Sequence, residues 1–156
     1  MLIAALLFLQ AAAAPSAQEE PVPAYRPSNA NAGAVPFNND KLWKAFHSAP
    51  GVARIVDGLI ARSQADPRIS DIFRNHDMVR LRRTLNEQFC YILGGGCSYT
   101  GRDMTAAHKD MGIQQADMAA LVENLQAAMR QEHVPFAAQN RLLAKLAPMH
   151  RDVVTR

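Results

Sequence analysis

Apolar residues recur at helical spacing in the middle of the chain, and this pattern predicts two long helices. In the first, five apolar positions share one helical face: Val52, Ile55, Val56, Leu59 and Ile60. In the second, the apolar stripe consists of Met78, Leu81, Leu85, Phe89 and Ile92. Asp77 is a good N-cap for this second helix, and the glycines at 94–96 are expected to end it.

The same spacing continues through the C-terminal part of the chain. A helix that begins after Ile113 carries Met118, Leu121, Val122, Leu125 and Met129 on one face. Pro135 is expected to open a last helix whose apolar face holds Leu142, Leu143, Leu146 and Val153. Shorter helices are expected from Asp66-Pro67 and over residues 103–111, the latter ended by Gly112.

No stretch of the chain alternates polar and apolar residues, so the pattern predicts an all-α fold. Amphipathic helices with short connections must pack on each other, and a plain bundle and a globin-like packing both remain open. The three consecutive glycines favour the second arrangement, because they allow a long loop after a long helix.

The 156 residues divide into three parts. Residues 1–17 are apolar and uncharged, and too short for a stable membrane span, which is typical of a signal peptide. Residues 18–38 are rich in proline and show no apolar period, so we expect a disordered linker there. Residues 39–156 form the single folded domain. The leader predicts export, to the periplasm of a bacterium, although no Lys or Arg precedes the apolar run; a cytoplasmic location is the alternative if the segment is no signal.

Charge and cysteine content narrow the possible functions. The net charge is +3 and the basic residues are scattered, so nothing indicates a nucleic-acid partner. The two cysteines, Cys90 and Cys97, are compatible with a disulfide in an exported protein or with two free thiols. No CxxCH motif is present, so any haem would be held non-covalently.

One of the five histidines stands apart through its surroundings. His108 follows Met104 by one helical turn and is preceded by the small residues Ala106 and Ala107. The imidazole is therefore expected on an apolar face with room beside it, which is how a proximal histidine meets haem iron. The second ring nitrogen of such a histidine normally bonds a backbone carbonyl.

The residues around His108 resemble the proximal-helix motif of group 1 truncated haemoglobins. The motif reads Tyr-Thr-Gly-x-x-Met-x-x-x-His-x-x-x-Gly-Ile and starts at Tyr99. The similarity continues in order through residues 65–67, 71–73, 77–81, 89–95, 142–148 and 152–154, so it covers about residues 40–156. It implies a globin-like, two-over-two helical sandwich around one haem b.

The resemblance also implies roles for individual residues. His108 would be the iron ligand, and Phe73 would pack on the face of the haem. Four residues would line the distal side: Met78, Leu81, Leu85 and Phe89. Four more would surround the rest of the cofactor: Met104, Ile113, Met118 and Leu121. Arg80, Arg102 or Lys109 could pair with the haem propionates near the rim, or simply be solvated charges.

The sequence departs from the family pattern on the distal side. Where many relatives have tyrosine and glutamine donors, this chain has Ile60 and Leu85, and Leu81 occupies the other usual distal position. None of these can donate a hydrogen bond to a bound gas. Gln88, Thr84 or Tyr91, from the flank of the same helix, are candidates to replace the missing donor.

The leading functional hypothesis is reversible binding of a diatomic gas, oxygen or possibly nitric oxide or carbon monoxide, rather than enzymatic turnover. Alternatives on the same haem are nitric oxide dioxygenation, which needs an unknown reductase as partner, and peroxide chemistry, which needs a distal acid–base group. A haem carrier or a haem-based gas sensor is a further alternative. We expect a monomer or a weak oligomer.

Overall fold

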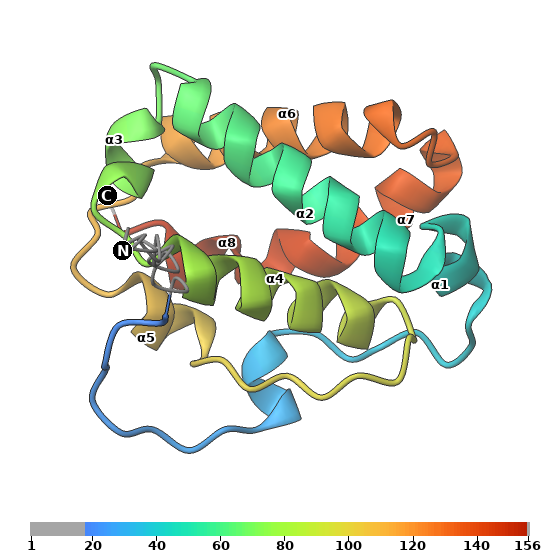
Figure 1. Ribbon diagram of the computed structural model, residues 1–156, viewed down its shortest axis with the longest axis horizontal. Helices are drawn as coiled ribbons and strands as arrows, with labels where there is room; N and C mark the ends of the chain where they lie inside the picture. Colours follow the sequence, from blue (N-terminus) through green and yellow to red (C-terminus); the bar gives the residue numbers. More distant parts are fainter. Residues whose placement is uncertain (1–17, 156) are drawn as a thin grey trace, which may run out of the picture.

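Four longer helices form the scaffold of the molecule. The computed structural model describes residues 18–155, and the predicted signal segment lies outside them. The longer helices are α2 (Ser48–Ala65), α4 (Met78–Ile92), α6 (Gln115–Gln131) and α7 (Phe136–Leu146). Helix α2 packs on both α4 and α6, and α7 follows α6 and lies behind α2 and α4 in the view of Figure 1. Residues 18–155 contain helices and loops and no strand, which confirms the predicted all-α class.

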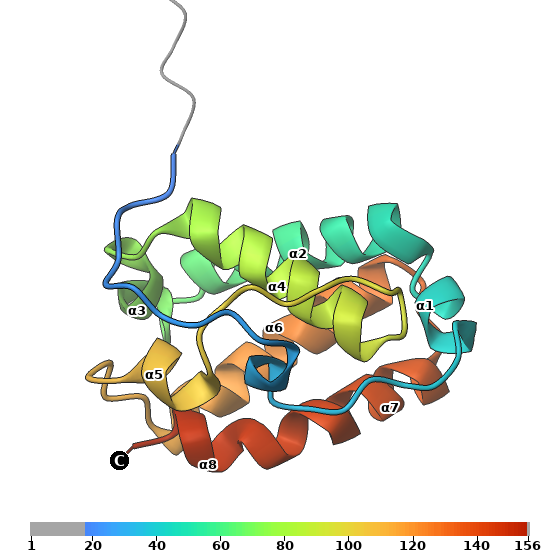
Figure 2. The ribbon, with the colours of Figure 1, turned by 90° about the horizontal axis from the view of Figure 1, so that it is seen from below.

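Short helices complete the fold and connect the longer ones. They are η1 (Asn29–Ala32), α1 (Lys41–Ala45), α3 (Ser70–Arg74), α5 (Met104–His108), η2 (Ala147–Met149) and α8 (His150–Val153). Figure 2 shows α5 and α8 close together at one end of the molecule, below α4. No helix within residues 18–155 is long and apolar enough to cross a membrane.

The predicted apolar stripes meet in one core. All five stripe positions of α2 are at most 4% exposed, and they pack with Phe89 and Ile92 of α4 and with Leu125 and Met129 of α6. Gly58 lies where α2 and α6 approach each other: a Cβ at this position would be 3.4 Å from the Cβ of Ala128. The core therefore fixes α2 between its two neighbours.

Both ends of α4 follow the sequence signals. Asp77 caps its start, where Oδ1 accepts a hydrogen bond of 2.9 Å from the Arg80 backbone. At the other end Gly94 has φ +83°, and a Cβ there would lie 2.5 Å from the Asn39 carbonyl oxygen. Cys90 and Cys97 form a disulfide across this turn, with their Cα atoms 5.7 Å apart. The disulfide was one of two alternatives for these cysteines.

Two of the predicted helices are shorter in the structure than the spacing indicated. The helix expected over 103–111 ends at His108, because Lys109 leaves the helical region and Asp110 has φ +63°. The last helix is interrupted after Leu146, and η2 and α8 follow it. Pro148 explains this break, since proline lacks the N–H that a continuing helix would use.

The segment of residues 18–38, which we name the N-terminal strap, differs from the disordered linker that its composition predicts. It runs along α4 and the loop before α5 (Figure 2). Tyr25 donates to the Thr100 carbonyl at 2.8 Å, and Asn31 Nδ2 donates to the Gly101 carbonyl at 3.1 Å. Ala32 is completely buried. Hydrogen-bond partners from the domain thus order a segment that has few apolar residues.

Candidate functional site: an apolar cavity beside His108

A cavity of about 490 Å³ opens between α2, α4, α5 and the start of α6. This volume lies within the range of ligand and cofactor sites. Its lining is mainly apolar and includes Leu59 and Ile60 from α2, Ile69 and Ile72 around α3, and Val153 from α8. Every long helix except α7 therefore contributes to its walls.

His108, at the end of α5, lines this cavity as the sequence predicts. Its Nδ1 lies 2.8 Å from the backbone carbonyl of Met104, one helical turn earlier. Burial lowers the pKa of His108 below its ordinary value of 6.5; the Met104 hydrogen bond acts in the opposite direction, and nearby His76 lowers it further. The ring is therefore neutral at pH 7, and Nε2 is the nitrogen that can bind a metal.

The other wall of the cavity carries the three apolar residues that replace the family's donors. Ile60 of α2 and Leu81 and Leu85 of α4 all line it. Figure 1 places α2 and α5 on opposite sides of α4, and these apolar residues line the same cavity as His108. A ligand between the walls would have an imidazole on one side and hydrocarbon on the other.

Most of the predicted cofactor contacts lie in the cavity. Five more of them line it: Phe73, Met104, Ile113, Met118 and Leu121. Met78 and Phe89 are not among the lining residues, although both were expected on the distal side. Phe89 is 2% exposed within the core where the later part of α4 packs on α2, and Met78 packs against the same core from the first turn. The apolar stripe of α4 is therefore shared between cavity and core.

The three candidate replacement donors are used elsewhere or lie outside the cavity. Gln88 lines it, but its Nε2 donates to the Ala32 carbonyl at 2.9 Å. Thr84 also lines it, with its hydroxyl 2.9 Å from the Arg80 carbonyl of its own helix. Tyr91 is not among the lining residues. The two candidates that line the cavity, Thr84 and Gln88, therefore both already donate to a backbone carbonyl.

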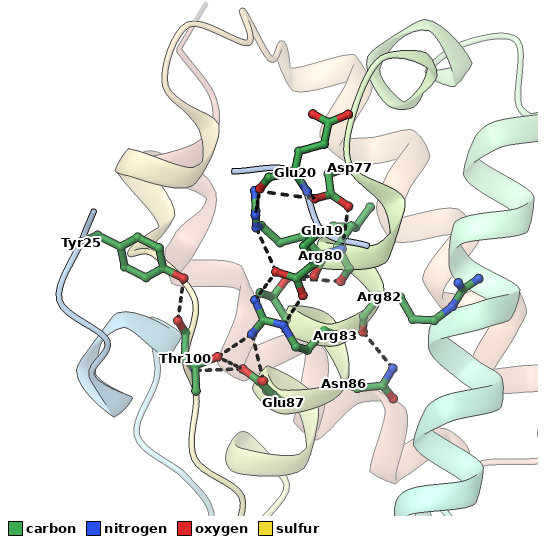
Figure 3. A network of polar contacts seen from close by, with 12 residues as sticks. Glu19, Glu20, Tyr25, Asp77, Arg80, Arg82, Arg83, Asn86, Glu87 and Thr100 are labelled. Carbon is green, nitrogen blue, oxygen red and sulfur yellow. Dashed lines mark hydrogen bonds and ion pairs between the residues drawn. The ribbon is translucent and has the colours of Figure 1, made fainter. Parts of the chain in front are cut away.

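The rim of the cavity is closed by the N-terminal strap through an ionic network (Figure 3). Glu19 binds Arg83 and also lies 3.3 Å from Arg80. Arg83 in turn reaches Glu87 at 3.0 Å, and the pKa of Arg83 is raised by its bond to Glu19. Glu20, Val22 and Tyr25 of the strap line the cavity, as do Arg80, Arg102 and Lys109, the three cationic residues considered as partners of the haem propionates.

Sequence reasoning missed two contributions to this site. The strap was one, since no local pattern shows which surface a proline-rich segment will meet. The other is Ser63, which lines the cavity and is completely buried. It lies one turn beyond Leu59 and Ile60, so continuing the phase of the α2 stripe would have found it.

Comparison with known proteins matches the chain to one family over most of its length. The profile of the bacterial-like globins matches residues 41–155. The group 1 truncated hemoglobin of Tetrahymena pyriformis is 31% identical over 90 residues, which are 58% of this chain and 74% of that protein. The chain therefore belongs to the bacterial-like globin family, and the group 1 truncated haemoglobins are its relatives there.

Solved structures agree with this assignment. The crystal structure of the Tetrahymena pyriformis protein in its Fe(III) form superposes with a TM-score of 0.70 at 25% identity, covering 74% of this chain and 98% of that one. The 2/2 hemoglobin of Synechococcus sp. PCC 7002, in the cyanomet state and with covalently attached heme, gives a TM-score of 0.68 at 25% identity and the same coverage. The fold is thus that of a truncated haemoglobin, a class of haem-based gas-binding proteins.

Proposed function

We propose that this protein holds one haem b non-covalently through His108 and binds a diatomic gas reversibly, with oxygen as the principal ligand. The observation that carries the proposal is the state of His108. The ring is partly buried, its Nδ1 is held by a backbone carbonyl, and Nε2 remains for iron at the wall of an apolar cavity.

The residues present suit a haem in two further respects. The apolar lining can cover a large flat ring, with Phe73 and Met118 among the contacts. The rim carries Arg80, Arg102 and Lys109, whose positive charges suit the two carboxylates of a haem. Haem supplies an iron centre that binds small gases, while this chain positions it, excludes water and sets the polarity around the ligand.

Absorption spectra of the ferric, ferrous and carbonyl forms test the proposal directly. We expect the parent protein to bind haem stoichiometrically and to form reversible carbon monoxide and oxygen complexes. His108→Ala should change the spectrum of every form, because it removes the metal ligand. His76→Ala is the matched control, since His76 lines the same cavity, and we expect its spectra to equal those of the parent. Unchanged spectra in His108→Ala, or no haem uptake by the parent, would contradict the proposal.

We further infer that the protein works outside the cytoplasm, in the bacterial periplasm if the leader is a signal. The Cys90–Cys97 disulfide supports this, because such bonds persist in oxidising compartments. Cell fractionation with N-terminal sequencing of the mature protein tests it. Recovery of a chain that retains its first seventeen residues, with both thiols reduced, would contradict the inference.

A further inference from the structure

Ser63 carries a buried hydroxyl that the fold leaves without a partner. The residue belongs to α2, is 0% exposed and lines the cavity beside Ile60. Among the described residues, its Oγ is the only buried side-chain nitrogen or oxygen that has no hydrogen bond. Serine inside a helix usually bonds the carbonyl of the preceding turn, and Ser63 does not. Buried polar groups are nearly always paired, so this hydroxyl indicates a partner that enters the cavity.

Four other hydroxyl and amide groups of the lining are already engaged, whereas Asn75 and His76, which also line the cavity, are exposed. Thr84 donates to its own helix, and Gln88 donates to the Ala32 carbonyl. Tyr25 and Tyr99, nearer the rim, donate to the Thr100 and Arg102 carbonyls at 2.8 Å and 2.9 Å. Redirecting any of these would break an existing hydrogen bond, whereas Ser63 would lose none.

The position of Ser63 matches the side of the cavity where a gas would lie. It is one helical turn from Ile60, on the helix that Figure 1 places across α4 from α5 and its His108. A ligand held opposite His108 would meet Ile60, Leu81 and Leu85 first, and none of these can donate. The Ser63 hydroxyl is the donor available on that side.

We propose that Ser63 Oγ–H is the hydrogen-bond donor to the bound gas in the distal cavity, taking the place of the family's tyrosine and glutamine. This proposal rests on the gas-binding function above. A single hydroxyl favours oxygen over carbon monoxide, because bound oxygen carries more negative charge. Removing the Ser63 hydroxyl should speed oxygen release by roughly two- to tenfold, because this factor corresponds to the free energy of one neutral hydrogen bond.

The test compares two variants that have almost the same shape. Ser63→Thr keeps the hydroxyl and Ser63→Val lacks it, and both add a methyl group. Carbon monoxide is the probe, because a donor to the ligand lowers its C–O stretching frequency. We expect Ser63→Val to raise this frequency relative to Ser63→Thr and to release oxygen faster. Ser63→Ala, which adds no bulk, should behave like the valine variant and keep or raise the melting temperature of the haem-free protein.

Thr84→Val is the control for any hydroxyl in the cavity. The Thr84 hydroxyl is already bonded to the backbone, so this variant should change the C–O frequency and oxygen release less than Ser63→Val does. Equal frequencies in the parent, Ser63→Val and Ser63→Ala would overturn the proposal and indicate that Ser63 meets only a water molecule. That result would leave gas binding itself intact, whereas a parent that takes up no haem would overturn both.

Discussion

At the scale of single residues, the two walls of the cavity differ in chemistry: one carries an imidazole, and the other carries hydrocarbon side chains. His108 presents one ring nitrogen, and the Met104 carbonyl fixes the orientation of the ring. Across the cavity, Ile60 and Leu85 offer hydrocarbon where a donor would slow ligand release. Chemistry on this side therefore depends on very few polar atoms, and single substitutions should change it measurably.

Leu85→Gln should restore a donor of the kind that relatives have at the aligned position. An amide that reaches the bound gas should slow oxygen dissociation by roughly ten- to a hundredfold, since hydrogen bonds to a charged partner contribute about 1.5–3 kcal/mol. Stopped-flow displacement of oxygen by carbon monoxide measures the rate. Leu85→Met, which has similar size and no donor, is the control. A glutamine variant as fast as the methionine variant would show that position 85 does not reach the ligand.

Asp77 makes the start of α4 sensitive to acid. Its carboxylate accepts hydrogen bonds from the backbone N–H groups of Arg80 at 2.9 Å and of Glu20, in the strap, at 2.7 Å. The Arg80 bond is the main reason why the pKa of Asp77 lies below its ordinary value of 3.8. Because the folded-state pKa is depressed, the stabilisation is present above pH 3.8 and is lost as the pH falls through the lower, folded-state value.

We expect Asp77→Ala to lower the free energy of unfolding by about 1 kcal/mol at pH 7, through loss of the helix cap. The difference from the parent should shrink as the pH falls from 3.8 through the lower, folded-state pKa of Asp77, because the parent's carboxyl then becomes protonated too. Urea unfolding followed by circular dichroism at several pH values measures both effects. Asp77→Asn keeps a capping oxygen and should lose less. Equal losses in the two variants would contradict the capping role.

At the scale of elements, the end of α4 and the loop after it set the position of α5. The disulfide ties Cys90 of the last turn to Cys97, across a sequence separation of 7. Gly95 permits this tight return, since a Cβ there would lie 2.8 Å from the Trp43 ring. The chain then runs through Tyr99 to α5 and His108, so the disulfide anchors the start of the loop that leads to the proposed iron ligand.

Removing the disulfide should therefore cost stability. We expect the Cys90→Ala/Cys97→Ala double variant to lose about 2–3 kcal/mol of unfolding free energy, the chain-entropy value for a loop this short. Urea midpoints with and without a reductant measure it. The parent should become less stable when reduced, and the double variant should not respond. The prediction would be contradicted if the urea midpoint of the parent stayed the same after reduction, in a sample whose two thiols are shown to be free.

At the scale of the whole molecule, the N-terminal strap turns a crevice between helices into a covered cavity. Arg83 is the centre of this closure, because it binds Glu19 of the strap, Glu87 of its own helix and the Thr100 hydroxyl (Figure 3). The charges are partly exposed, so the network contributes modestly to stability. Its larger effect should be on access to the cavity.

We expect Arg83→Ala to speed haem loss about two- to fivefold, which corresponds to an ion pair of up to about 1 kcal/mol. Transfer of haem to an excess of apo-globin measures the rate. Arg82→Ala is the matched control, since Arg82 pairs with Asp57 of α2 and is not among the cavity-lining residues. Equal rates in the two variants would show that the strap does not retain the cofactor.

Much of the fold could be predicted because its signals are local. The apolar stripe of α2 and the Asp77 cap each depend on residues within a few positions of one another. The Met104–His108 spacing likewise predicts the hydrogen bond that holds the ring. The end of α5 was less predictable, because Lys109 leaves the helix three residues before the glycine that was expected to end it.

The sequence by itself determined the helical stripes, the all-α class and the singular surroundings of His108, because these follow from side chains that share one turn or one face. Only the tertiary structure decided that Gln88 is occupied, that Phe89 belongs to the core, that the strap lines the cavity and that, among the buried side chains of residues 18–155, Ser63 has a hydroxyl without a partner. Gln88 donates to a carbonyl that is 56 positions away in the sequence, and Tyr25 donates to a carbonyl that is 75 positions away. Such partners are brought together by packing, so no local pattern encodes them.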